Sequence, residues 1–287
     1  MYEAIKWNIW KSRLLLFFAL VFVSAVAYVF SLTYRGSVLV PVAFVVAMVS
    51  AIGSYYAADK IVLMSMQARE ADRGEFPHYV NSVEGLAIAA GMPTPRAYVV
   101  DDPSPNAFAT GRDPAHAVIC VTTGLLSIMN RTELEGVIAH EMSHIRNYDI
   151  RFMTVIAVLV GFVALLSDWF RWGGRIRSDS RNNGVIIIFG LLLAILAPIA
   201  TALIQAAVSR RREYLADANG ALLTRYPDGL ASALRKIAQH PAKLHAASKA
   251  TAHMFIVNPL KKLGSESVSL FDTHPPLADR ITKLEAM

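Results

Sequence analysis

The residues best suited to catalysis lie at positions 140–144, which read H-E-M-S-H inside a predicted helix. Residues four apart share a helix face, so the imidazoles of His140 and His144 can reach one metal ion. Glu141 follows the first histidine directly and can accept a proton from the attacking water as a general base. The alternative is an exposed helix face with two ordinary histidines. Because the H-E-x-x-H pattern is rare by chance, a zinc site is favoured.

A catalytic zinc ion normally takes three protein ligands, so a third ligand must come from elsewhere in the chain. Glu213 is the candidate, since it precedes Asp217 by four residues just after a long apolar segment. If this stretch is helical, Asp217 lies on the same face and can accept a hydrogen bond from a ligand histidine. The alternative for both carboxylates is ion pairing with the arginines at 210–212. The ligand types favour a single Zn²⁺ per chain.

The motif needs elements that position it, and the sequence around it predicts a helix and a small sheet. Thr132 is predicted to begin the motif helix, with Glu135 completing a capping box. A further helix is predicted over Phe76–Gly91, with Pro77 in its first turn and Gly91 as its C-terminal cap. The strands of the sheet are predicted at segments rich in β-formers, namely Arg96–Asp102, Asn106–Gly111 and Ala117–Val121.

Long apolar segments flank these elements. The 287 residues are 54% apolar and only 17% charged, with a mean hydropathy of +0.40, a composition unlike that of soluble domains. The segments long enough to cross or enter a bilayer are Leu14–Leu32, Val38–Ala57, Phe152–Ser167 and Val185–Val208. The predicted fold class is therefore α+β: a mostly helical membrane protein with about four transmembrane or membrane-associated helices, and a zincin-like catalytic region with a small β-sheet.

These segments predict a division of the chain into an N-terminal transmembrane hairpin (1–57), a catalytic region with the motif (58–151), a second hydrophobic hairpin (152–208) and a C-terminal catalytic region with the third ligand (209–287). Phe152–Ser167 is the weakest span, because its apolar core has the length of a buried or re-entrant helix. Whether the second hairpin crosses completely stays open.

Positive charge predicts the orientation of the chain. Lys and Arg near the apolar segments are more numerous on the side of the N-terminus and the catalytic region. This bias predicts a multi-pass protein of the inner (plasma) membrane whose active site faces the cytoplasm. A net charge of +6 would also suit nucleic acid, but the same residues flank apolar segments, so no nucleic-acid partner is expected. The lone cysteine, Cys120, excludes an intrachain disulfide.

The chain resembles the HtpX family of bacterial membrane metalloproteases, which is related to the CAAX prenyl endopeptidases. The resemblance covers nearly the whole chain. It rests on H-E-M-S-H at 140–144 and E-Y-L-A-D at 213–217, with N-A-F-A at 106–109, T-H-P-P at 273–276 and Asp279-Arg280. It implies zinc bound by His140, His144 and Glu213, with Glu141 as the base. It also implies cleavage of damaged or misfolded membrane proteins from the cytoplasmic side, so the expected partners are these protein substrates and the lipid bilayer.

Other residues are candidates for supporting roles. An extended substrate could add to an edge strand that begins at Asn106, although a plain structural strand is an equal alternative. His274 could donate to the developing oxyanion or merely pack beside the prolines that follow it. Arg280 could pair with a carboxylate near the site, but a surface position is favoured. The histidines that lack ligand spacing, for which no role is expected, are His78, His116, His240, His245 and His253.

Two alternatives compete with a membrane-bound zinc endopeptidase. A protease with its zinc site inside the bilayer is disfavoured, because charged residues flank the motif on both sides and are costly in hydrocarbon. A metal-binding scaffold or transporter is disfavoured, because transport sites are usually built from polar residues within spans and these segments contain almost none.

Overall fold

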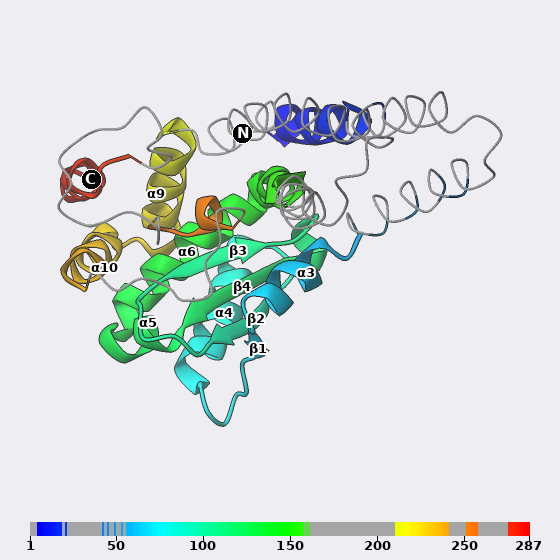
Figure 1. Cartoon of the computed structure of the whole chain (residues 1–287). Coiled ribbons are helices and arrows are strands. Elements are labelled where there is room, and N and C mark those ends of the chain that lie inside the picture. Colours follow the sequence, from blue (N-terminus) through cyan, green and yellow to red (C-terminus); the bar gives the residue numbers. More distant parts are fainter. Residues whose placement is uncertain are drawn as a thin grey trace, which may run out of the picture.

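The computed structural model describes residues 5–18, 21, 42, 45, 49, 53, 56–157, 159–160, 210–240, 251–257 and 275–287, and Figure 1 shows their arrangement. The predicted hairpins over 1–57 and 152–208 fall mostly outside these residues, as does His274. Among the residues that the structure describes, no helix is both long and apolar enough to cross a membrane. The first predicted catalytic region, 58–151, is described throughout.

A mixed sheet supports the site. Its strand order is β1-β2-β4-β3, with β2 and β4 parallel and the other two pairs antiparallel. Every residue of β4 is buried, which suits its apolar and β-branched sequence V-I-C-V-T. The small sheet predicted from the sequence is confirmed, and β1 is an addition to it. The strands are β1 (Arg69–Glu70), β2 (Arg96–Val100), β3 (Ala107–Thr110) and β4 (Val118–Thr122).

Helices cover both faces of the sheet. Side chains alternate along a strand, so Ile119 packs in the core shared with α4 and α6, whereas its neighbour Cys120 packs in a second core with α3. In Figure 1, α3 lies in front of the sheet and α4 behind it. Helix α4 begins with Pro77 and ends at Gly91 in the left-handed conformation (φ 62°), as predicted. These helices are α3 (Ala58–Ser65), α4 (Pro77–Ala90) and α6 (Arg131–Arg146).

Helix α6 is capped two residues earlier than the sequence predicted. The side chain of Asn130 accepts a hydrogen bond from the backbone N–H of Glu133 at 3.0 Å, and Glu133 accepts one from the backbone N–H of Asn130 at 2.8 Å. The capping box predicted at Thr132 and Glu135 is therefore wrong. Buried Glu133 also binds the ammonium group of Lys236 at 2.6 Å, so a long-range contact favours the earlier pair.

A layer of C-terminal helices packs against α6. Helix α9 comes so close at Gly220 that a Cβ atom there would lie 3.1 Å from the backbone nitrogen of His140. At Gly136, a Cβ atom would lie 2.7 Å from the backbone nitrogen of Leu230 in α10. Glycine permits both approaches because it has no Cβ. The remaining elements are α5 (Thr123–Ile128), α9 (Arg210–Thr224), α10 (Pro227–Gln239), α11 (Leu277–Glu285), η1 (Pro114–His116) and η3 (Ala252–Met254).

Strand β3 is the edge of the sheet nearest the motif helix, and the segment after η3 pairs with its outer side. Phe108 and Phe255 form an antiparallel bridge, and the backbone N–H of Ile256 donates to the carbonyl of Ala107 at 2.9 Å. The side-chain amide of Asn106 donates to the carbonyl of Val257 at 2.8 Å. The chain itself therefore occupies the first part of this edge.

Candidate metal centre

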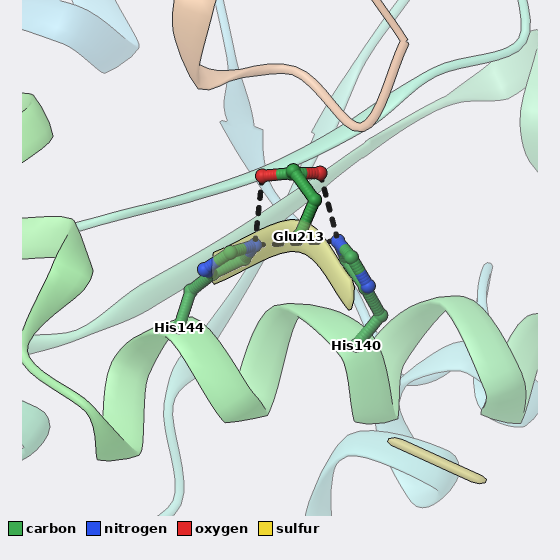
Figure 2. A group of neighbouring side chains, drawn as sticks. All are labelled: His140, His144 and Glu213. Carbon is green, nitrogen blue, oxygen red and sulfur yellow. Dashed lines mark hydrogen bonds and ion pairs between the residues drawn. The ribbon is translucent and has the colours of Figure 1, made fainter. Parts of the chain in front are cut away.

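His140 and His144 project from one face of α6 toward the same point (Figure 2). Their Nε2 atoms lie 3.3 Å apart. Only 1% of His140 and 6% of His144 is exposed. The alternative interpretation of the motif, an exposed helix face, is therefore wrong.

Glu213 reaches the two histidines from α9, and Figure 2 shows its carboxylate lying across both rings. Oε1 lies 3.6 Å from Nε2 of His144, and Oε2 lies 3.9 Å from Nε2 of His140. One ligand atom from each residue lies within 4.8 Å of the others, and within the described ranges no other group of three such residues could hold a metal ion. Gly220, two turns after Glu213, allows α9 to lie this close to α6.

The Nδ1 atom of His140 faces a carboxylate oxygen of Asp217, at 2.9 Å. Asp217 lies one turn after Glu213 on α9, so a single helix supplies both carboxylates, as the four-residue spacing predicted. A carboxylate at Nδ1 fixes the tautomer in which Nε2 carries the lone pair.

His144 has a matching partner that the sequence reasoning missed. Its Nδ1 atom lies 3.0 Å from Oδ2 of Asp149. Asp149 follows α6 across a turn in which Tyr148 adopts a left-handed conformation, φ 59°. Helical periodicity gives no signal for such a turn; the only hint was a carboxylate shortly after the motif.

Arg280 joins this network from α11, and the surface position favoured from the sequence is wrong. Its side chain is fully buried, at 0% exposure. Nε and Nη2 donate to the two oxygens of Asp217 at 2.9 and 2.7 Å, and Nη1 donates to the carbonyl of Ile256 at 3.1 Å. Nη1 also lies 3.6 Å from Oε2 of Glu213. Burial of a guanidinium requires such pairing, and Asp217 supplies it.

The electrostatics of the two histidines differ. Burial lowers the pKa of His140 despite the hydrogen bond with Asp217, so this ring is neutral near pH 7. Burial would also lower the pKa of His144, but the hydrogen bond with Asp149 and the charge of Glu213 outweigh it and raise this pKa to about 9. Without a metal ion, the site therefore carries a proton on His144.

Glu141 lies between this cluster and the sheet. Its carboxylate accepts a hydrogen bond from the backbone N–H of Ala109 in β3. Burial, and the neighbouring charge of Glu213, raise its pKa to about 7 against the lowering effect of His144. A group with this pKa can both take up and release a proton near neutral pH.

The cluster suits a divalent metal ion in the number and type of its donors. Because each Nδ1 faces a carboxylate, each histidine in its neutral form presents the lone pair of Nε2 toward the same point, and His144 does so once it has lost its extra proton. An oxygen of Glu213 joins them, so three electron-pair donors converge in a buried space. Two histidines and a glutamate form a known ligand set of catalytic zinc. The helix, the sheet and this cluster together define the class of metal-dependent peptidases.

Comparison with known proteins assigns the family. Residues 75–287 match peptidase family M48. A "Protease HtpX homolog" from Dictyoglomus turgidum is 48% identical over 294 residues, which cover 100% of this chain and 94% of that relative. Proteins of the same name from Caldanaerobacter subterraneus (52% identical) and Thermococcus kodakarensis (50% identical) align over 82% and 80% of this chain, and over 80% of each relative. The chain therefore belongs to peptidase family M48 and, within it, to the HtpX proteases.

The family resemblance predicted from the motifs is thus confirmed, and the chain is a metallopeptidase that acts on proteins. A crystal structure of S. mikatae Ste24p has a similar fold, with a TM-score of 0.52 and 19% sequence identity. The similarity covers 96% of this chain and 66% of that one. It supports the fold of a mostly helical protein with a small mixed sheet.

Proposed function

We propose that the chain is a membrane-bound, zinc-dependent endopeptidase that cleaves misfolded or damaged membrane proteins as part of quality control under stress. The observation that carries the zinc assignment is the convergence of Nε2 of His140, Nε2 of His144 and a Glu213 oxygen beside the carboxylate of Glu141. In this proposal the first three side chains hold a single zinc ion, and Glu141 performs the proton transfers.

When bound, zinc supplies the Lewis acid that polarises the scissile carbonyl and makes water acidic enough to react near neutral pH. Glu141 takes the proton of the attacking water and later delivers it to the leaving amine. Its pKa near 7 suits both steps. Asp217 and Asp149 hold the histidine rings in the tautomer that leaves Nε2 free. His274, outside the described residues, is kept as a proposed donor to the oxyanion.

The substrate is proposed to bind as an extended strand along β3. The edge at Ala107 is already paired with Ile256, and the Asn106 side chain holds Val257. Asn106 thus supports the chain's own segment. The part of the edge at Ala109 adjoins Glu141, so a strand added there would bring its peptide bond close to the proposed base.

The location is proposed from the sequence. The apolar segments and the distribution of Lys and Arg support a multi-pass protein of the inner membrane with the site on the cytoplasmic side. His144 and Glu213 precede and follow the 152–208 segment, so both of its ends must lie on the same side if the two residues share one zinc ion. The four-part division at 57, 151 and 208 follows from the same segments.

A direct test is cleavage of casein, an unfolded protein, by the purified full chain. We expect cleavage with zinc, loss of cleavage after treatment with a chelator, and recovery when zinc is restored. Zinc binding without cleavage would contradict the proposal and favour a metal-binding scaffold. Cleavage that persists in the chelated, zinc-free protein would contradict the zinc assignment.

A further inference from the structure

The carboxylate of Asp149 is held on both sides. Its Oδ2 atom faces Nδ1 of His144 at 3.0 Å, and its Oδ1 atom accepts a hydrogen bond from the side-chain amide of Asn8 at 2.8 Å. Nη1 of Arg212 also lies 3.4 Å from Oδ1. Asp149 is only 2% exposed, so its orientation is set by these partners and not by water.

Asn8 comes from the N-terminal helix, residues 5–18, drawn in blue in Figure 1. The side chain is 5% exposed, and its amide nitrogen makes a second hydrogen bond, to the carbonyl of Asn147 at 3.0 Å. Asn147 is the C-terminal cap of α6. Asn8 therefore spans the turn that carries Asp149, including Tyr148 in its left-handed conformation, φ 59°. A bulky residue rarely adopts this conformation without support from its surroundings.

The N-terminal helix also packs near Arg212, which contacts Asp149. Two cations lie over the ring of Phe152, with Nζ of Lys11 at 5.7 Å and the guanidinium carbon of Arg212 at 5.4 Å from its centre. Ser12, one turn after Asn8, is completely buried. The N-terminal helix is thus docked against the region that ends α6, and the contact with Asp149 is part of that docking.

Without Asn8, Oδ1 of Asp149 would lose its 2.8 Å hydrogen bond, while the 3.4 Å contact with Arg212 would remain and draw the carboxylate toward the guanidinium. His144 would then lose the acceptor that fixes its ring and tautomer. We propose that Asn8 is a positioning residue of the metal centre, which acts on His144 through Asp149 and makes docking of the N-terminal helix a condition for full metal affinity. The inference rests on the proposed zinc site.

The first test is the zinc affinity of the purified full chain, measured by competition with a chelator, for the wild type, Asn8→Ala and Ser12→Ala. Ser12 is the matched control, because it is buried on the same helix and its hydroxyl donates to the backbone carbonyl of Asn8, at 2.8 Å, rather than to Asp149. We expect Asn8→Ala to weaken zinc binding about tenfold, as loss of an outer partner does, and Ser12→Ala to leave it unchanged. Equal affinities of Asn8→Ala and the wild type would overturn the inference.

A second comparison separates positioning from general destabilisation. Asn8→Asp places a carboxylate opposite Asp149 and should weaken zinc binding. In an Asp149→Asn protein, the carboxylate introduced by Asn8→Asp accepts a hydrogen bond from the NH₂ group of the amide at position 149. The oxygen of that amide then faces His144. The double variant should therefore bind zinc more strongly than Asp149→Asn alone. If Asn8→Asp weakens zinc binding both in the wild type and in the Asp149→Asn protein, the inference is overturned. A wild-type chain that binds no zinc would instead refute the proposed function itself.

Discussion

Oδ1 of Asp217 lies 2.9 Å from Nδ1 of His140, and this contact determines which nitrogen of the ring can hold a metal ion. Because the carboxylate accepts the Nδ1 proton, the lone pair of Nε2 faces Glu213 and His144. Arg280 holds both oxygens of Asp217 in turn. A ligand of the proposed site is thereby fixed by two buried side chains that lie far apart in the sequence.

The two carboxylates of α9 should differ in their effect on metal binding. Glu213→Ala leaves two protein ligands and should abolish stoichiometric zinc binding. Asp217→Ala keeps all three and should weaken zinc binding about 10–100-fold. Zinc content after dialysis tests the loss of binding in Glu213→Ala, and competition with a chelator gives the zinc affinity of Asp217→Ala. Greater loss of zinc in Asp217→Ala than in Glu213→Ala would mean that their roles are exchanged.

Removal of Arg280 should destabilise the fold strongly. Arg280→Ala leaves the buried carboxylate of Asp217 without its cation, and breaking such a pair costs about 3–5 kcal/mol. The control is Arg235→Ala, which removes a half-exposed pair with Glu285 and should cost at most about 1 kcal/mol. Denaturant unfolding of the two variants gives the comparison, and equal free energies of unfolding would contradict the proposed importance of burial.

The close approach of α9 to α6 predicts a specific effect at Gly220. A Cβ atom there would meet the backbone of His140 at 3.1 Å, so Gly220→Ala should move α9 and its ligand Glu213 and weaken zinc binding. Gly85→Ala in α4 is the control, since no described residue outside its own helix turn lies within 4 Å of the added Cβ. It should stabilise the protein by about 0.5–1 kcal/mol through helix propensity and leave zinc affinity unchanged. Unchanged zinc affinity in Gly220→Ala would contradict this account.

Metal binding should release a proton from His144. Its pKa of about 9 in the metal-free site means that the ring is protonated at pH 8, and a metal ion can bind only the neutral ring. Zinc affinity should therefore rise as the pH rises toward 9 and level off above it. Calorimetry at pH 8 in buffers of different ionisation enthalpy counts the protons.

Asp149→Asn removes a cause of the raised pKa, so this variant should release fewer protons at pH 8 than the wild type. Binding heats that do not depend on the buffer would contradict the protonated state of His144.

Much of the site could be predicted because its residues follow helical periodicity. The spacing of His140 and His144, and that of Glu213 and Asp217, places each pair on one helix face, and the structure brings the two faces together. Asp149 was not predicted, because a left-handed turn at Tyr148, which helical periodicity does not indicate, brings its carboxylate next to His144.

Other features depend on contacts between distant parts of the chain. The burial of Arg280 rests on Asp217 and Ile256, so its sequence neighbours gave no sign of it. The capping box shifted to Asn130 and Glu133 because Lys236 holds Glu133. The predicted membrane spans lie mostly outside the described residues and stay predictions.

The most direct test of the central claim is a paired measurement of zinc content and casein cleavage in purified wild-type protein and Glu141→Gln. Glu141 lies beside the ligands but is not one of them, so the variant should keep its zinc and lose about 10²–10⁴-fold in cleavage rate, as expected for a general base. Full cleavage by Glu141→Gln would contradict the assignment of Glu141, and loss of its zinc would contradict the ligand set of His140, His144 and Glu213.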